Sequence, residues 1–122
     1  MIDFKNGSFI KLKRSDAAAE AVSQLLIPGE NIIGSYKGIR DSVTFTDKRV
    51  IAVNVQGVTG KKKDYTSLPY SKVQAFSVET AGVLDLDSEL ELWFSSVGLI
   101  KFEFTGNSDI VKIGQAIGTF IL

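Results

Sequence analysis

The feature that most constrains the fold is a two-residue alternation of apolar and polar side chains, repeated in short runs between residues 29 and 104. Successive side chains of a strand point to opposite faces, whereas a helix repeats its apolar positions every three or four residues. Glycine-containing turns interrupt the runs and mark where each one ends. The pattern predicts a mainly β fold, a small antiparallel barrel or sandwich of seven strands at residues 30–37, 42–46, 49–55, 61–67, 72–80, 86–94 and 99–105.

The connections between these runs predict how neighbouring strands pair. Asp47-Lys48 separates two β-rich runs by two residues, which indicates a tight hairpin, and aspartate tolerates the left-handed conformation that such turns often need. Residues 61–67 begin with three lysines, and charged side chains are typical of an edge strand that must not pair with other chains. We therefore expect this strand at the edge of a sheet.

Helical patterns occur only outside the β-rich region. Ser15 suits an N-cap, the alanines that follow are strong helix formers, and Pro28-Gly29 predicts a stop at about Ile27, with Ala18, Val22, Leu25 and Leu26 on one face. Residues 1–14 have the pattern of an extended arm. After residue 105, Asn107 or Ser108 can cap a second helix whose apolar positions are Ile110, Ile113, Ile117 and Phe120. Gly114 and Gly118 lie on one face of that helix and predict a close approach to a sheet.

Composition limits the classes of function. The 122 residues correspond to one domain, which we divide into an arm and helix at 1–28 and a barrel with its capping helix at 29–122. Fourteen basic and fourteen acidic residues give a net charge of zero, so nucleic acid is not expected as a partner, and the small self-repulsion permits self-association. No segment resembles a signal peptide or a membrane span, so a cytoplasmic location is expected.

Histidine and cysteine are both absent. The chain therefore lacks the usual general base near neutral pH and the usual ligands of transition metals, and an ordinary hydrolase or redox enzyme is not expected. We predict no catalytic residue, no metal and no cofactor.

Lys61, Lys62 and Lys63 follow Gly60 and form the strongest candidate for an anion site. Ammonium groups and backbone N–H groups of such a loop can hold phosphate. A run of lysines is more often a solvated strand edge, which is the favoured interpretation here. The binding hypothesis requires Lys37 and Arg40 to lie close to this cluster.

A second charged segment contains Asp85, Asp87, Glu89 and Glu91. The last three share one face of the predicted strand, which allows a metal or an acid–base hypothesis, whereas Leu86, Leu90 and Leu92 should take the other face. A strand with one wet side explains the pattern better, because calcium sites require a defined turn with glycine and carbonyl ligands. Trp93 and Phe94 should lie on opposite faces, leaving a large aromatic side chain to be exposed or packed against another subunit.

The order of motifs resembles the bacterial pleckstrin-homology-like domain family, stand-alone domains of unknown function. The segments that carry the resemblance are YKGIRD at 36–41, FTDKRVI at 45–51, QGVTGKK at 56–62, SLPY at 67–70, ETAG at 79–82 and DLDSEL at 85–90. The resemblance implies two nearly orthogonal antiparallel sheets with seven strands, a C-terminal helix that plugs one end, and ring-like homo-oligomers such as pentamers. It also makes the polar motif residues candidates for turn locking or subunit contacts: Arg40, Asp41, Arg49, Gln56, Glu79, Asp85 and Asp87.

The leading hypothesis is thus a non-enzymatic, self-assembling binding or scaffold domain, open to a protein partner. The alternative is a module for anionic lipid or a membrane surface that uses Lys61 to Lys63, with Lys37 and Arg40 as further ligand-binding candidates. The first loop carries only those two basic residues, which argues against phosphoinositide binding. A carboxylate-dependent hydrolase using Asp85, Asp87 or Glu89 is the third hypothesis.

Overall fold

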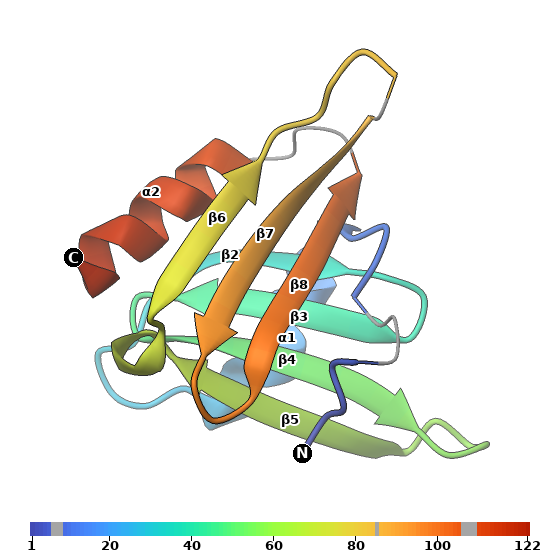
Figure 1. The fold of residues 1–122 in the computed structure, drawn as a ribbon. Helices are drawn as coiled ribbons and strands as arrows, with labels where there is room; N and C mark the ends of the chain where they lie inside the picture. The colour runs from blue at the N-terminus through green and yellow to red at the C-terminus, as the bar shows by residue number, and fades with distance from the viewer. Residues whose placement is uncertain (6–8, 85, 106–109) are drawn as a thin grey trace.

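The computed structural model describes residues 1–5, 9–84, 86–105 and 110–122. Two antiparallel sheets lie face to face, and their strands cross steeply in Figure 1. The five-stranded sheet has the order β1-β2-β3-β4-β5, with bounds Lys13–Arg14, Ile32–Lys37, Asp41–Thr46, Arg49–Gln56 and Lys62–Pro69. The three-stranded sheet has the order β6-β7-β8, with bounds Ala75–Glu79, Asp87–Phe94 and Gly98–Thr105.

The prediction of a mainly β fold with seven long strands is confirmed by β2 to β8. β1 is an additional strand of two residues, in which Lys13 pairs with Lys37 and Arg14 with Tyr36. So short a strand carries no alternation pattern that the sequence could reveal. Several predicted boundaries differ from the structure: β2 begins at Ile32 and β5 runs to Pro69. β6 begins at Ala75, after a 3-10 turn at Tyr70–Lys72, and Leu86 precedes β7 and is exposed.

The β3–β4 hairpin turns at Asp47 and Lys48 as predicted, but by a different mechanism. Neither residue has a positive φ. Instead, the hydroxyl oxygen of Thr46 accepts hydrogen bonds from the backbone N–H groups of Lys48 and Arg49, both at 3.0 Å. A side chain at the end of β3 therefore stabilises the turn, and glycine is not needed.

Helix α1 (Asp16–Val22) lies against the outer face of the five-stranded sheet (Figure 1). Ser15 caps it as predicted, since its hydroxyl accepts a hydrogen bond from Ala18 N–H at 3.3 Å. The predicted end near Ile27 is wrong, because the chain tightens into a 3-10 turn at Ser23–Leu25 and becomes extended at Leu26. Leu25 is consequently exposed, and Val22 anchors the helix on Ile51 and Val53.

The inner faces of the two sheets form one core with the N-terminal arm. Phe9 and Leu12 from the arm are fully buried in it, and the arm pairs with β8 through Leu12 and Phe104. Aromatic rings fill the centre, with edge-to-face contacts from Tyr36 to Phe104 at 5.0 Å and from Phe9 to Phe102 at 5.4 Å. The described part of the arm predicted at residues 1–14 therefore contributes apolar side chains to the core.

Helix α2 (Ile110–Ile121) covers one end of the barrel beside β6 (Figure 1). Ile110, Ile113 and Ile117 are buried as predicted, whereas Phe120 is half exposed and stacks on Tyr70. A Cβ atom added at Gly114 would lie 2.8 Å from Cγ2 of Val78, so the expected close approach to a sheet is confirmed. The candidate caps Asn107 and Ser108 lie outside the described residues.

No helix in the described ranges has the length and apolar character needed to cross a membrane.

Candidate functional site: a cationic groove beside the N-terminal helix

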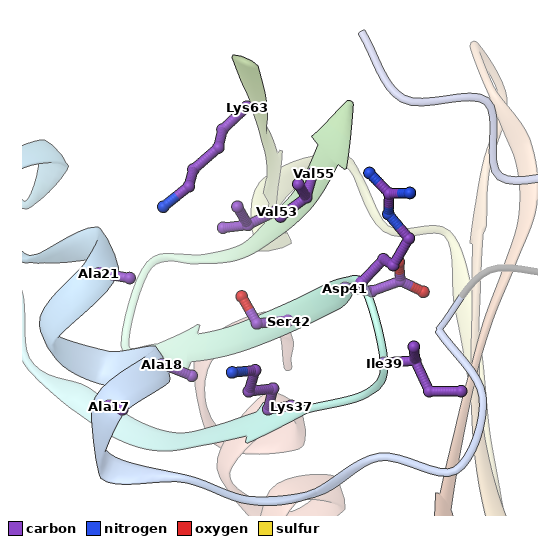
Figure 2. Close-up of a pocket in the computed structure, with 11 residues that line it drawn as sticks. Ala17, Ala18, Ala21, Lys37, Ile39, Asp41, Ser42, Val53, Val55 and Lys63 are labelled. Carbon is purple, nitrogen blue, oxygen red and sulfur yellow. The ribbon is translucent and has the colours of Figure 1, made fainter. Parts of the chain in front are cut away.

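A groove of about 200 Å³ lies between α1 and the outer face of the five-stranded sheet (Figure 2). Three alanines of α1 form one wall, and Val53 and Val55 of β4 form part of the floor. Lys37 lies at the end of β2, Lys63 lies near the start of β5, and Ser42 lies on β3 between them. The groove therefore combines an apolar body with polar groups supplied by three different strands.

Local sequence explains why a hollow remains here. Val22 draws α1 onto Ile51 and Val53, while the neighbouring positions that face the groove carry only methyl groups, at Ala17, Ala18 and Ala21. Larger side chains at those positions would fill the space between helix and sheet. The alanine run predicted a helix, but nothing in it indicated a groove, because that depends on where the helix docks.

The lysines of the groove have no anionic partner among the residues that the structure describes. Figure 2 shows the side chains of Lys37 and Lys63 extending toward α1 on either side of the Ser42 hydroxyl. Within the described ranges, neither ammonium group forms a hydrogen bond or an ion pair. The third cation of the lining is Arg40, which donates to the carbonyl oxygen of Gly57 at 3.0 Å.

Among the described residues that line the groove, Asp41 is the single carboxylate, and both of its oxygens are occupied. Oδ2 accepts from the backbone N–H of Phe9 at 2.6 Å, and Oδ1 accepts from the side-chain amide of Asn54 at 3.1 Å. Asp41 thus ties the arm to β3 and β4. Three cations against one carboxylate leave the lining with an excess of positive charge.

The structure brings together only part of the predicted ligand-binding set. Lys37, Arg40 and Lys63 share the groove, so the proximity that the anion hypothesis required holds for one of the three clustered lysines. Lys61 and Lys62 are exposed outside it, at the β4–β5 connection, where Gln56 pairs with Lys62. The expected edge position of this strand is confirmed, since β5 ends the five-stranded sheet.

The acidic candidates lie on the other sheet. Glu79 ends β6 and Asp87 begins β7, where its carboxylate forms an ion pair with Lys11 at 2.8 Å. Asp87, Glu89 and Glu91 alternate with the buried Ser88, Leu90 and Leu92, as a strand with one wet side requires. Asp85 lies outside the described residues.

Arg49 organises the segment that leads from α1 into β2. Its guanidinium forms two hydrogen bonds to the buried carboxylate of Glu30, each at 2.9 Å, and also donates to the carbonyl oxygen of Leu25 at 2.7 Å and to Ser67 Oγ at 2.9 Å. The hydroxyl of Thr46 donates to the same carboxylate at 2.7 Å. The hydrogen bonds from Arg49 and Thr46 outweigh desolvation and lower the pKa of Glu30 to about 2. Sequence reasoning did not single out Glu30, which follows the turn at Pro28-Gly29 and has no motif to mark it.

Sequence reasoning also missed Ser42 and the alanine wall of the groove. Ser42 appeared only as the start of a strand, and a lone hydroxyl in a strand carries no signal of its own. Its relevance depends on the lysines from β2 and β5 that lie on either side of it (Figure 2).

Comparisons with known proteins agree with this architecture. The family model of the bacterial PH domain matches residues 3–121. The chain is 48% identical over 103 residues to the uncharacterized protein YjqA of Bacillus subtilis (strain 168), an alignment that covers 83% of this chain and 82% of the relative. YjqA carries no functional description in its name.

Two solved structures are similar in sequence and in fold. A DUF1696 family protein with a pleckstrin-homology domain from Shewanella loihica PV-4 is 38% identical with a TM-score of 0.75, and the match covers 92% of this chain and 97% of that one. A pleckstrin homology domain from Shewanella amazonensis SB2B is 39% identical with a TM-score of 0.63, covering 95% and 94%. The match over nearly the whole length, together with the two crossed sheets and the helix at one end, places this chain in the bacterial PH domain family.

Proposed function

We propose that this chain is a non-enzymatic binding and scaffold module that assembles head to tail into a homo-oligomer. In each contact, the outer face of the β6-β7-β8 sheet of one copy meets the β4–β5 hairpin of the next. The observation that carries the proposal is the separation of opposite charges onto two sheets of a chain whose net charge is zero.

The two sheets carry opposite charge. The five-stranded sheet holds Lys13, Arg14, Lys37, Arg49, Lys62 and Lys63 against Asp41 and Asp64. The three-stranded sheet holds Glu79, Asp87, Glu89, Glu91 and Glu103 against Lys101. Complementary patches on different parts of one surface favour a heterologous contact, which can close into a ring.

The acidic face contains one row of three glutamates. Glu89 is the cross-strand partner of both Glu79 and Glu103, so three like charges stand side by side across the sheet. Like charges at directly opposed positions destabilise a sheet. Lys101 binds Glu89 at 3.2 Å, and its pKa is raised mainly by that carboxylate and further by Glu91 and Glu103. Ammonium groups from a second copy would relieve the repulsion that remains.

The β4–β5 hairpin can supply those ammonium groups. It projects beyond the body of the barrel, away from the glutamate row (Figure 1). Lys61 and Lys62 at its end are exposed, and neither has a carboxylate partner within the described ranges. The two patches belong to different sheets, and no ion pair joins them within the described ranges, which favours a contact between copies.

An apolar patch lies at the other end of the acidic face. Trp93 and Leu99 are cross-strand partners on the outer face, with exposed fractions of 47% and 50%, and Ala75 on β6 is paired with Trp93. Large aromatic and aliphatic side chains supply most of the favourable free energy in protein interfaces, while charges set register and association rate. The face therefore offers both parts of an interface.

The non-enzymatic part of the proposal has chemical support from the sequence. A chain without histidine or cysteine lacks the usual general base near neutral pH and has carboxylate, lysine and tyrosine side chains for acid–base chemistry. The carboxylate with the most strongly shifted pKa, Glu30, accepts hydrogen bonds from Arg49, Thr46 and the backbone of Ile27. Those bonds hold it in its ionised form and occupy both oxygens.

Charge reversal and mixing test the assembly. We expect size exclusion coupled to light scattering to show oligomers for the parent chain and monomers for Lys61→Glu/Lys62→Glu and for Glu79→Lys/Glu103→Lys. Mixing the two double variants should restore oligomers that contain both, because each then presents a patch complementary to the other. Lys112→Glu, at an exposed position on α2, is the matched control and should assemble normally. A monomeric parent chain, or double variants that assemble as the parent does, would refute the proposal.

Binding to an anionic lipid surface is the second candidate function. Lys61, Lys62 and Lys63 are consecutive and exposed, and the adjacent Asp64 is already engaged by the terminal ammonium of Met1 at 2.8 Å and by Thr66. Each lysine near an anionic membrane contributes about 1 kcal/mol. We expect the parent chain to co-sediment with phosphatidylserine vesicles and Lys61→Ala/Lys62→Ala/Lys63→Ala not to. Equal sedimentation of both proteins would eliminate this function.

A further inference from the structure

The groove beside α1 has a polar end with unused binding capacity. Lys37 and Lys63 extend into one space without a carboxylate partner among the described residues, although like charges in a common groove repel each other. The hydroxyl of Ser42 between them also has no partner there. Two cations and a hydroxyl that converge in this way are complementary to a carboxylate or a phosphate.

The other charged groups of the lining each have a hydrogen-bond partner within the protein. Asp41 accepts hydrogen bonds through both oxygens, and the guanidinium of Arg40 donates to Gly57. The carboxylate in the lining therefore leaves the two lysines unneutralised. The positive charge of the groove is available to a ligand.

The rest of the groove is apolar and small. Alanine side chains form the helix wall, and Val53 and Val55 line the sheet side. A volume of about 200 Å³ corresponds to six or seven water molecules at ~30 Å³ each. It lies below the roughly 300–1,000 Å³ of pockets that hold drug-sized ligands. The space suits a compact molecule.

We propose that this groove binds a small organic anion, a carboxylate or phosphate monoester on a compact apolar body. Lys37 and Lys63 bind the anion, Ser42 donates a hydrogen bond to it, and Ala17, Ala18 and Ala21 contact the apolar part. α1 lies outside the crossed-sheet barrel, so the site depends on the docked N-terminal helix as well as on the strands. This site is independent of head-to-tail assembly, which uses Lys61, Lys62 and the opposite sheet.

Calorimetry on the full chain tests the ligand class, with acetate, 3-methylbutanoate, neutral 3-methylbutanamide and inorganic phosphate as probes. We expect 3-methylbutanoate to bind more tightly than acetate because of its apolar body, inorganic phosphate to bind through its charge alone, and the amide not to bind. Hydrogen exchange with mass spectrometry should then show protection confined to α1 and to the segments that contain Lys37, Ser42 and Lys63. Binding of the neutral amide, or no binding by any anion, would overturn the proposal.

Variants separate the charge from the shape of the groove. Lys37→Gln and Lys63→Gln should each weaken 3-methylbutanoate binding about tenfold, which corresponds to about 1.4 kcal/mol. Ala21→Leu keeps both lysines but fills the groove, so it should abolish binding while the thermal unfolding curve shows an intact fold. Lys48→Gln, exposed in the β3–β4 turn, is the matched control. Full affinity in Ala21→Leu or in both lysine variants would overturn the site.

Two further experiments identify the source of the anion and test whether anion binding is independent of assembly. In the first, hydrogen exchange of α1 is measured with phosphatidic acid vesicles and with free anions. Protection of α1 by the vesicles but not by free anions would assign the groove to a membrane headgroup and overturn the free-ligand proposal. The non-assembling Lys61→Glu/Lys62→Glu variant should bind 3-methylbutanoate with parental affinity. Loss of binding in this variant would make the site dependent on assembly and contradict its independence.

Discussion

The guanidinium of Arg49 and the carboxylate of Glu30 form a two-point ion pair, with Nη2 to Oε1 and Nε to Oε2 both at 2.9 Å. The Glu30 side chain is fully buried in this contact, and that of Arg49 is only 19% exposed. The pair joins the start of β2 to the start of β4, and through Leu25 it also holds the segment that follows α1.

This ion pair makes stability depend on pH in the acid range. The pKa of Glu30 is about 2 in the folded chain against 4.5 ordinarily, so the ionised form is stabilised by about 3 kcal/mol. The contribution is complete above about pH 4.5 and is lost as pH falls toward 2. We expect Glu30→Gln to be less stable at pH 7 and to lose less stability over that interval than the parent chain. Urea unfolding at a series of pH values measures both, with Glu20→Gln, an exposed glutamate, as control. Parallel curves for Glu30→Gln and the parent would contradict the assignment.

Thr46 should be sensitive to loss of its hydroxyl rather than of its volume. It is completely buried, accepts from two backbone N–H groups and donates to Glu30. Thr46→Val preserves the shape and leaves these groups unpaired, each at a cost of about 1–3 kcal/mol, so we expect a destabilisation of at least about 2 kcal/mol. Thr46→Ser keeps the hydroxyl and should lose clearly less. Denaturant unfolding of the two variants at one protein concentration measures both losses of stability. Equal losses in Thr46→Val and Thr46→Ser would show that packing, not the hydroxyl, dominates.

The two glycines on one face of α2 should respond to alanine with opposite signs. In Gly114→Ala the new methyl group would lie 2.8 Å from Val78, and the strain should cost about 1–3 kcal/mol, more than the gain of about 1 kcal/mol in helix propensity. In Gly118→Ala the nearest atom is Cζ of Phe76 at 3.8 Å, an ordinary contact, so that variant should be more stable than the parent. Val78→Ala should partly rescue Gly114→Ala in the double variant. Thermal unfolding of the parent chain, the two glycine variants and the double variant checks these expectations. A Gly114→Ala variant more stable than the parent would show that α2 can shift.

The N-terminal arm should contribute to global stability through one side of its chain. Leu12→Ala removes a fully buried side chain and should cost about 2–5 kcal/mol. Ile10→Ala, at a position half exposed on the same arm, should change stability by no more than about 0.5 kcal/mol. Urea unfolding monitored by the fluorescence of Trp93 on β7 measures the global effect. Similar small losses in both variants would mean that the arm can detach without unfolding the barrel.

Much of the architecture could be predicted because its causes are local. The alternation in β2 to β8, the N-cap at Ser15 and the spacing of Ile110, Ile113 and Ile117 are properties of neighbouring residues, and the structure confirms them. The errors occur where a distant contact decides. α1 ends at Val22 because the following segment is held by Arg49 from β4, and β1 exists because the arm meets the edge of β2.

The sequence by itself determined the mainly β class, the order of its elements and the absence of histidine and cysteine chemistry. It also identified every lysine of the candidate sites, but it did not show which of these lysines share a surface. Only the tertiary structure decided that Lys37 and Lys63 lie in one groove while Lys61 and Lys62 lie outside it, and that the glutamates collect on the opposite sheet. The physical reason is that periodicity fixes the direction of a side chain within its own strand, whereas proximity between strands depends on pairing, crossing and the docking of α1.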